Sequence, residues 1–289
     1  MALYSICSLF VDTDIEPSSY RPFLINGDNT CEDADLIIRR TNKTLLCKRL
    51  TKSVVLSDLI VWKNVISEKD YSWVFEARNG MFTIFVDKNY TSVKCYSLYT
   101  KDSLNFEFDN VLGEYLKIII ECKLVQRGFT ILHSSCVEIN GVAYAFTGPS
   151  GIGKSTRAGK WCELIGAEWI SGDRPVIDAQ SGFVYGVPWD GKEKIYRNVK
   201  YPLTAVLKVK RSTETRIFIM QNEDKLRLLC EQTFIPLWDT GLAAISFLSL
   251  KHLIKKVAVF ELSSDITNES SNQAYEIVTA YIDEIGGNG

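Results

Sequence analysis

A glycine-rich segment near the middle of the chain constrains its fold more than any other feature. Residues 148–155 read Gly-Pro-Ser-Gly-Ile-Gly-Lys-Ser, which matches the pattern G-x-x-x-x-G-K-[ST]. Glycines let the backbone curl until several N–H groups point at one anion, and a helix that starts there adds partial positive charge. In such loops the lysine reaches the β- and γ-phosphates and the Ser/Thr hydroxyl contacts Mg²⁺. The segment therefore predicts a phosphate-binding loop.

Both flanks of this segment fit a strand–loop–helix unit. Residues 142–147 form a mostly apolar, β-prone run, as expected of a buried strand. Residues 156–165 are compatible with an amphipathic helix that ends at Gly166, a residue suited to a left-handed C-terminal position. The apolar face of that helix would contain Ala158, Trp161, Cys162 and Ile165.

The pattern assigns residues to a nucleotide and its metal, so ATP and Mg²⁺ are the expected cofactors. The predicted nucleotide-binding residues are Gly148, Ser150, Gly151, Ile152, Gly153, Lys154, Ser155 and Thr156. Ser155 would be one metal ligand, and Asp173, which follows the apolar run Trp169-Ile170, is the candidate for a second. In open α/β sheets, ligands gather at the carboxyl ends of strands, where both Gly148 and Asp173 would lie. A surface ion pair between Asp173 and Arg174 is the alternative.

Composition and charge narrow the classes of protein further. Of the 289 residues, 46% are hydrophobic and 24% charged, as in folded globular proteins. The formal net charge of −2 argues against a nucleic-acid partner, which would need a broad basic surface. No apolar run approaches the ~20 residues that span a bilayer, and residues 1–7 lack the basic start of a secretory signal. Eight cysteines without a C-x-x-C pair, and only two histidines, disfavour a zinc site and predict a cytoplasmic protein.

Hydrophobic periodicity divides the chain into two predicted domains. Residues 1–108 contain short alternating runs separated by turn residues, with Asn79-Gly80 as a hairpin signal, and predict a small β-rich domain. The aspartates of this region are interpreted as solvated loop carboxylates: Asp12, Asp14, Asp33 and Asp35. Residues 109–289 are predicted to form the nucleotide-binding domain, so that the expected fold class is α/β, and α+β overall.

The C-terminal domain is predicted to alternate helices and strands. Helices are expected over residues 111–128, 222–232, 242–256 and 272–285, in addition to the one after the loop. Further strands are expected over residues 129–132, 135–139, 168–170, 183–185 and 203–209.

A second group of polar residues lies in the segment 186–193. Pro188 and two glycines restrain this loop, and loops of such composition at the edge of a sheet often carry function. The predicted substrate contacts are Trp189, Asp190 and Glu193. Lys192 and Arg197 are candidate catalytic cations that would stabilise a transferring phosphoryl group. A solvated hairpin without function is the alternative.

Several motifs together resemble the C-terminal domain of bacterial HPr kinase/phosphorylase, a family related in its nucleotide-binding fold to phosphoenolpyruvate carboxykinase. They are Leu132-His133, Gly141, the loop 148–155, and residues 171–174. The likeness covers roughly residues 130–210 and lies in the order and spacing of these motifs. The segment 186–193 is also similar to a Pro-Trp segment of HPr kinase-like proteins outside the true HPr kinases.

This resemblance implies a kinase that moves the γ-phosphoryl group of ATP to a hydroxyl. His133 matches a histidine that family members carry before the loop. The family also has two adjacent aspartates before an arginine, which divide metal contact and activation of the acceptor, whereas this chain has Gly172-Asp173-Arg174. Asp173 is therefore the expected metal ligand, and either Asp173 or His133 is the expected general base, with Lys154 neutralising phosphate charge.

The acceptor is expected to be a small polyol or other metabolite, or a serine in a peptide or protein. HPr itself is not expected, because residues 237–285 do not match the family's partner-recognition elements. The N-terminal region is a candidate for orienting the acceptor or for forming a homo-oligomer. Three alternatives remain open: a non-catalytic nucleotide-binding regulatory module, a carboxykinase-like lyase, and a simple NTPase.

Overall fold

Packing divides the chain into two compact units. The computed structural model describes residues 1–25, 34–41, 47–56, 58–67, 71–97, 106–189 and 191–286. Unit 1 contains Met1–Gln126 together with Pro236–Thr240, and unit 2 contains Arg127–Ile235 together with Gly241–Gly289. The helix that ends at Gln126 therefore belongs to unit 1, whereas the predicted second domain begins at residue 109.

Unit 1 is built on a mixed eight-stranded sheet with the order β1-β2-β3-β8-β7-β6-β5-β4. The strands are β1 (Ala2–Ile6), β2 (Leu9–Thr13), β3 (Leu36–Thr41), β4 (Cys47–Val55), β5 (Leu59–Ser67), β6 (Tyr71–Ala77), β7 (Phe82–Asp87) and β8 (Ser92–Ser97). β3 pairs in parallel with both β2 and β8, and the remaining pairs are antiparallel. The predicted turn at Asn79-Gly80 joins β6 to β7, and Gly80 has the positive φ of 71° that such turns require.

The helix α1 (Phe106–Gln126) and the short 3₁₀ helix η1 (Ser18–Phe23) pack with this sheet. The ring of Tyr115 in α1 meets the ring of Phe82 in β7 edge-on, with 4.4 Å between centroids. A Cβ atom at Gly113 would lie 2.7 Å from Cγ of Pro17, so only glycine permits this approach of helix and chain. The predicted apolar stripe of α1 is confirmed by four of its buried residues: Leu112, Leu116, Ile119 and Ile120.

One carboxylate of unit 1 is placed differently from the prediction. Asp12 lies in β2 with no exposed surface and forms an ion pair with Arg39 of β3. The interpretation of Asp12 as a solvated loop residue is therefore wrong, because the strand continues through it and Arg39 neutralises it. Asp14 accepts the backbone N–H of Arg40 at 3.0 Å, while Asp33 lies outside the described residues.

Unit 2 contains a second mixed sheet, in which β12-β10-β11-β15 form the part that carries the loop. Its described strands are β9 (Phe129–Ile131), β10 (Ser134–Ile139), β11 (Val142–Thr147), β12 (Glu168–Ser171), β13 (Val176–Asp178), β14 (Phe183–Tyr185), β15 (Lys200–Arg211), β16 (Arg216–Ile219) and β17 (Ala258–Ser264). β15 pairs in parallel with β11 and with β17. The start of β15 also pairs with β14, which continues the sheet through β13 to β9.

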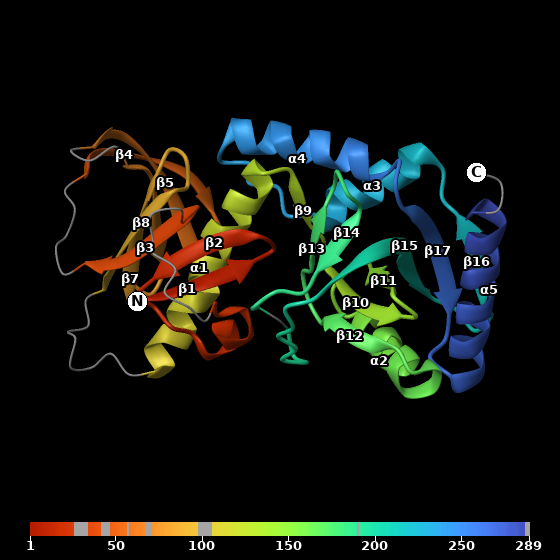
Figure 1. The fold of residues 1–289 in the computed structure, drawn as a ribbon. Helices are drawn as coiled ribbons and strands as arrows, with labels where there is room; N and C mark the ends of the chain where they lie inside the picture. The colour runs from red at the N-terminus through yellow and green to blue at the C-terminus, as the bar shows by residue number, and fades with distance from the viewer. Residues whose placement is uncertain are drawn as a thin grey trace. The chain divides into compact units, whose positions relative to one another are not determined.

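Helices cover both faces of this sheet: α2 (Lys154–Ile165) and α5 (Asn268–Gly286) on one, α3 (Asn222–Gln232) and α4 (Thr240–Leu253) on the other (Figure 1). β11 shows why, because its side chains alternate between two apolar cores. Tyr144 and Phe146 face α2, where Trp161 meets their rings edge-on at 5.4 and 4.9 Å between centroids. Ala143 and Ala145 join the other core, with residues of α3 and α4.

These two mixed sheets with their helices make the chain an α+β protein, as predicted. The strand before the loop has the predicted bounds, and α2 ends at Gly166, whose φ of 75° is the expected left-handed value. β13, β16 and β17 were not predicted. Among the described helices, none has the length and apolarity that crossing a membrane requires.

Candidate functional site

The loop between β11 and α2 has a backbone conformation that depends on its glycines. Gly148, Gly151 and Gly153 have φ values of 142°, 74° and 106°, all in the region that other residues rarely adopt. The N–H of Ile152 donates to the carbonyl oxygen of Pro149 at 3.3 Å, so the chain curls back on itself within the loop. The glycine-rich loop, defined here as residues 148–153, therefore makes a tight turn that leads directly into α2.

The helix α2 starts directly after this loop. Arg157 donates its backbone N–H to the carbonyl oxygen of Gly153 at 3.1 Å, which closes the first helical turn. The N–H groups of Lys154, Ser155 and Thr156 precede that bond, and the first turn of a helix offers them no intrahelical acceptor. Such groups carry the positive end of the helix dipole, so this turn could bind an anion such as phosphate.

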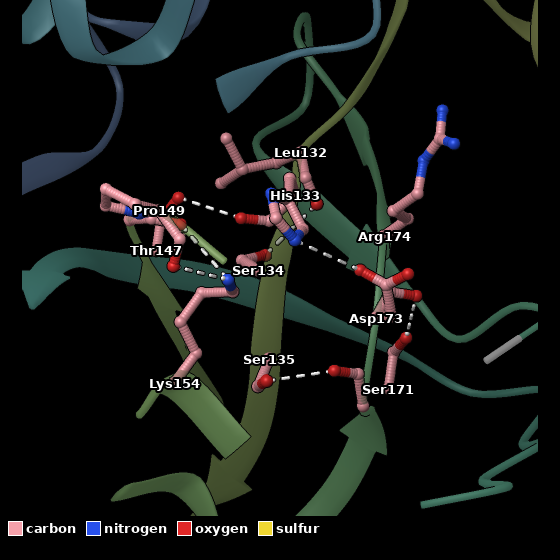
Figure 2. A network of polar contacts seen from close by, with 12 residues as sticks. Leu132, His133, Ser134, Ser135, Thr147, Pro149, Lys154, Ser171, Asp173 and Arg174 are labelled. Carbon is pink, nitrogen blue, oxygen red and sulfur yellow. Dashed lines mark hydrogen bonds and ion pairs between the residues drawn. The ribbon is translucent and has the colours of Figure 1, made fainter. Parts of the chain in front are cut away.

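Lys154 extends back over the loop (Figure 2). Its Nζ donates to the carbonyl oxygens of Gly148 at 3.0 Å and Pro149 at 3.2 Å. Partial burial lowers the pKa of Lys154, and the nearby Asp173 carboxylate opposes this change. The ammonium group is thus held by neutral acceptors at the mouth of the loop, where it could contact a phosphate.

Strand direction brings three separate segments to one edge of the sheet. β10 runs antiparallel to both β11 and β12, so its first residues lie beside the last residues of its two neighbours. His133 immediately precedes β10, Gly148 follows β11, and Asp173 lies just after β12. The predicted convergence of these residues is therefore a consequence of strand order, and Figure 2 shows His133 between Lys154 and Asp173.

His133 and Asp173 face each other at this edge. Nε2 of His133 lies 3.8 Å from Oδ1 of Asp173, and both side chains are about one-third exposed (39% and 32%). The separation is longer than a hydrogen bond and short enough for an ionic interaction when the ring is protonated. Both groups are accessible to a ligand, which is what a proton-transferring pair requires.

The surroundings of His133 favour its neutral form. Burial lowers its pKa below the ordinary value of 6.5, the positive charge of Lys154 lowers it further, and Asp173 opposes both. The ring also forms a hydrogen bond with the Gln232 side chain, while the backbone N–H of His133 donates to the Gln232 carbonyl oxygen at 2.7 Å. Thr147 donates its hydroxyl to the carbonyl oxygen of His133 at 2.9 Å. A neutral imidazole, positioned by α3 and β11, could accept a proton.

The turn that carries Asp173 is fixed by serine hydroxyl groups (Figure 2). Ser171 donates to the carbonyl oxygen of Asp173 and Ser135 to that of Gly172, each at 2.9 Å. Arg174 has a φ of 55°, and its guanidinium lies 5.2 Å from the centroid of the Phe234 ring. Figure 2 shows its side chain extending away from the Asp173 carboxylate.

Trp189 is buried against the same turn rather than exposed to a ligand. It is only 2% exposed, and its Nε1–H donates to the carbonyl oxygen of Arg174 at 3.2 Å. A Cβ atom at Gly191 would lie 3.3 Å from Cβ of Asp173, so the segment 186–193 packs directly against the candidate site. A substrate contact by the indole, as predicted, has no exposed ring surface to use; the geometry makes Trp189 a positioning residue.

The remaining residues that were predicted to act on the phosphate or the substrate are Arg197, Lys192, Glu193 and Asp190. Arg197 donates to the carbonyl oxygen of Trp169 and, at 2.9 Å, to Glu168 at the start of β12, the end opposite Asp173. The structure therefore does not bring the Arg197 guanidinium to the loop. Lys192 is exposed and Glu193 is half-buried, and Asp190 lies outside the described residues.

The oxygen atoms of Ser155 and Asp173 fit a hard divalent cation. A hydroxyl on the first turn of α2 and a carboxylate at the same sheet edge are the ligand types that Mg²⁺ takes from proteins, with phosphate oxygens and water completing its shell. The residues that position this site, Gln232, Ser135 and Ser171, were not predicted. Gln232 and Ser135 belong to no motif, and only strand pairing and the end of α3 reveal them, whereas Ser171 lies in the motif 171–174 but had no predicted role.

Comparisons with known proteins add no assignment to this geometry. The chain matches no protein-family model, and a search of curated proteins finds no significant relative.

Proposed function

We propose that this chain is an ATP- and Mg²⁺-dependent kinase that transfers the γ-phosphoryl group to a hydroxyl acceptor. The observation that carries the proposal is the convergence of the glycine-rich loop, His133 and Asp173 at one edge of the unit 2 sheet. The resemblance of these motifs to the HPr kinase/phosphorylase family supports the same reaction class. Phosphoryl transfer depends mainly on positioning and charge neutralisation, which this edge could supply.

The proposed roles follow from the contacts of each residue. The N–H groups of the loop and first turn of α2 bind the triphosphate, and Lys154 exchanges its carbonyl partners for phosphate oxygens. Ser155 and Asp173 would hold Mg²⁺, which supplies further neutralisation of phosphate charge when bound. Because phosphate oxygens repel an approaching hydroxyl, this neutralisation lowers the barrier to attack.

The His133–Asp173 pair prepares the acceptor. The acceptor oxygen forms a bond to the γ-phosphorus as the bond to the bridging oxygen of ADP breaks, and the acceptor proton must leave. Gly172 provides no second carboxylate, so the proton passes to the pair, at a carboxylate oxygen of Asp173 or at Nε2 of His133. The neutral state that burial favours in His133 keeps Nε2 able to receive it.

A second candidate function, a nucleotide-binding regulatory module without turnover, has one observation in its favour. Gly172 stands where the resembling family has its first aspartate, which leaves one carboxylate for two duties. A carboxykinase-like lyase has less support, because that reaction class would need a second metal site built from histidine and lysine.

The deciding experiment follows the label of [γ-³²P]ATP in the presence of Mg²⁺, with the purified full chain and separate pools of metabolites and of peptides. We expect labelled product in one pool, which also identifies the acceptor as a small hydroxyl compound or a serine-containing polypeptide. Label released only as inorganic phosphate would indicate an NTPase. Tight binding of Mg·ATP without any turnover would replace the kinase by the regulatory module.

A further inference from the structure

A group of three charged residues lies on the unit 2 sheet beside the glycine-rich loop. Lys208 of β15 and Lys210 two positions later both contact Glu261 of β17, with distances of 3.3 and 2.6 Å from Nζ to the carboxylate oxygens. Two ammonium groups therefore share one carboxylate, and these three residues, which we call the lysine–glutamate cluster, keep a net positive charge. Although burial acts against it, hydrogen bonds from Lys210 and Lys208 lower the pKa of Glu261.

Strand register places this cluster next to the residues of the candidate site. Thr147, the last residue of β11, is the cross-strand partner of Lys208, which in turn is paired with Glu261. On its other side, Thr147 donates its hydroxyl to the carbonyl oxygen of His133 at 2.9 Å. Neighbouring strands lie about 4.8 Å apart, so two strand spacings, or about 10 Å, separate the start of β10, next to His133, from Lys208. A small metabolite can span a distance of this order.

The cluster lies where an apolar surface ends. Side chains two positions apart on a strand share a face, so Lys208 lies on the same face as Val206, and Glu261 on the same face as Val259. Both valines are completely buried in the core that α3 and α4 cover. At the next step along each strand, the side chain is charged and partly exposed, 29% for Lys208 and 23% for Glu261. The core therefore ends in the row of residues from which the loop begins, and the cluster is open to a ligand.

Stability alone gives little reason for this arrangement. Ion pairs that water reaches contribute little to the free energy of unfolding. Two like charges on one face of a strand repel each other, and the single carboxylate of Glu261 balances only one of them. An anionic group of a ligand would balance the other, which is the arrangement expected of a surface that attracts an anion.

We propose that the lysine–glutamate cluster binds an anionic group of the phosphoryl acceptor, so that the acceptor is a small hydroxyl compound that also carries a carboxylate or a phosphate. The inference rests on the proposed kinase function and narrows its acceptor. The acceptor hydroxyl lies at the His133–Asp173 pair, and its anionic group lies at Lys208 and Lys210. Glu261 holds the two ammonium groups in place when the acceptor is absent and competes with it when it binds. A neutral polyol has no group for the cluster to bind.

The first test asks which class of compound receives the label of [γ-³²P]ATP from the full-length chain in the presence of Mg²⁺. A metabolite extract, freed of nucleotides with charcoal, is divided on an anion-exchange resin at a pH at which amino acids are also retained. We expect labelled product from the retained, anionic compounds alone. Transfer to the unretained neutral compounds, or only to peptides, would overturn the anionic small-molecule acceptor and leave the kinase standing. Transfer in no pool would overturn the proposed kinase itself.

Two substitutions then test the cluster, and the measurement is the amount of the retained fraction that gives half-maximal transfer at saturating ATP. Lys208→Met should raise this amount about tenfold and should change the KM for ATP by less than about twofold. Glu261→Gln should lower the amount about threefold, because the two ammonium groups lose their competing carboxylate. Lys160→Met is the matched control, because Lys160 is similarly exposed (26%) and pairs with Glu163 at 3.1 Å on the helix after the loop.

A purely structural cluster would give a different result. Both substitutions would then lower the unfolding temperature without changing the acceptor requirement, and this outcome would overturn the proposal. A Lys208→Met variant that weakened ATP as much as the acceptor would assign the lysine to the nucleotide and overturn it as well. Lys210→Met is a further variant, because Lys210 is half exposed and its replacement disturbs no core; it should raise the acceptor requirement in the same direction as Lys208→Met. Opposite changes in the lysine and glutamate variants would support the binding role, because a loss of packing changes both in the same direction.

Discussion

Charged side chains have different kinds of partner in two parts of the molecule. In unit 1, Asp12 pairs with Arg39 across neighbouring strands and Arg40 pairs with Asp109 of α1, while the buried Lys123 also donates to oxygen atoms of Asn89 and Gln126. Around the loop of unit 2, by contrast, three cations are bound to backbone carbonyl oxygens. Lys154 contacts two carbonyls of the loop, Arg157 the ends of β15 and β17, and Arg211 a further loop carbonyl.

This difference separates a structural use of charge from a binding use. An ion pair cancels charge and cross-links two elements, whereas a carbonyl satisfies a donor and leaves the positive charge for another partner. Leaving it uncancelled has a cost, visible in the pKa values of Lys154 and Arg157, both of which burial lowers. Perturbed pKa values of this kind concentrate at functional sites, which supports the proposed binding of a phosphate at the loop.

The largest expected effect comes from removing the loop cation. Lys154→Ala should lower phosphoryl transfer about 1,000-fold, because it removes the ammonium group that neutralises phosphate charge directly at the mouth of the loop. Its unfolding temperature should stay within a few degrees of the unaltered chain, since Lys154 pairs with carbonyls and lies outside both cores. Lys160→Ala, which removes an exposed ion pair with Glu163 on the same helix, is the control. Near-normal turnover in Lys154→Ala would exclude the loop as the phosphate site.

In unit 1 we expect the removal of a charged residue to lower stability and to leave nucleotide binding unchanged. Asp12→Ala leaves Arg39 without its buried partner, and we expect a loss of about 3 kcal/mol in the free energy of unfolding, measured by urea denaturation. The affinity of the folded protein for Mg·ATP should not change. Glu214→Ala breaks the exposed pair with Arg216 and should cost less than about 1 kcal/mol. If Asp12→Ala weakened Mg·ATP binding while its free energy of unfolding stayed unchanged, the distinction between structural and binding charges would be wrong.

Whether a feature of this contrast could be predicted from the sequence depends on how far apart its interacting residues lie along the chain. The loop, its preceding strand and α2 depend on neighbours within about twenty residues, and glycine spacing with hydrophobic alternation predicted them. α3 has the predicted bounds for the same reason. Asp12 was misread because its partner lies 27 positions later, and alternation of apolar residues does not reveal a buried carboxylate.

The unpredicted parts of the site depend on which strands become neighbours. β17 was missed because it is buried on both faces, so that its apolar residues Val259, Phe260 and Leu262 do not alternate strictly with polar ones. Arg197 was assigned to the phosphate from composition alone, whereas the path of its segment carries it to the start of β12.

The next effect concerns the carboxylate at the sheet edge. Asp173→Asn keeps the size of the side chain and the backbone bond from Ser171, and it removes the negative charge. We expect transfer to fall about 100-fold and the Mg²⁺ concentration for half-maximal rate to rise. Glu168→Gln changes a carboxylate at the opposite end of β12 and serves as the control. An unaltered magnesium titration in Asp173→Asn would remove this residue from the metal shell.

The smallest and most local effect is the titration of His133, which reports the sign of the charge around it. With His252→Gln as background, one histidine remains and its ring can be followed by NMR. Burial and Lys154 depress the folded-state pKa below 6.5, so the neutral ring contributes stability above that pH, and this contribution is lost as pH falls through the folded-state value. Lys154→Ala should raise the pKa and Asp173→Asn should lower it, because the first removes a repelling charge and the second an attracting one. Shifts of the opposite sign, or none in either variant, would mean that the loop lysine and Asp173 do not act on one proton-accepting site.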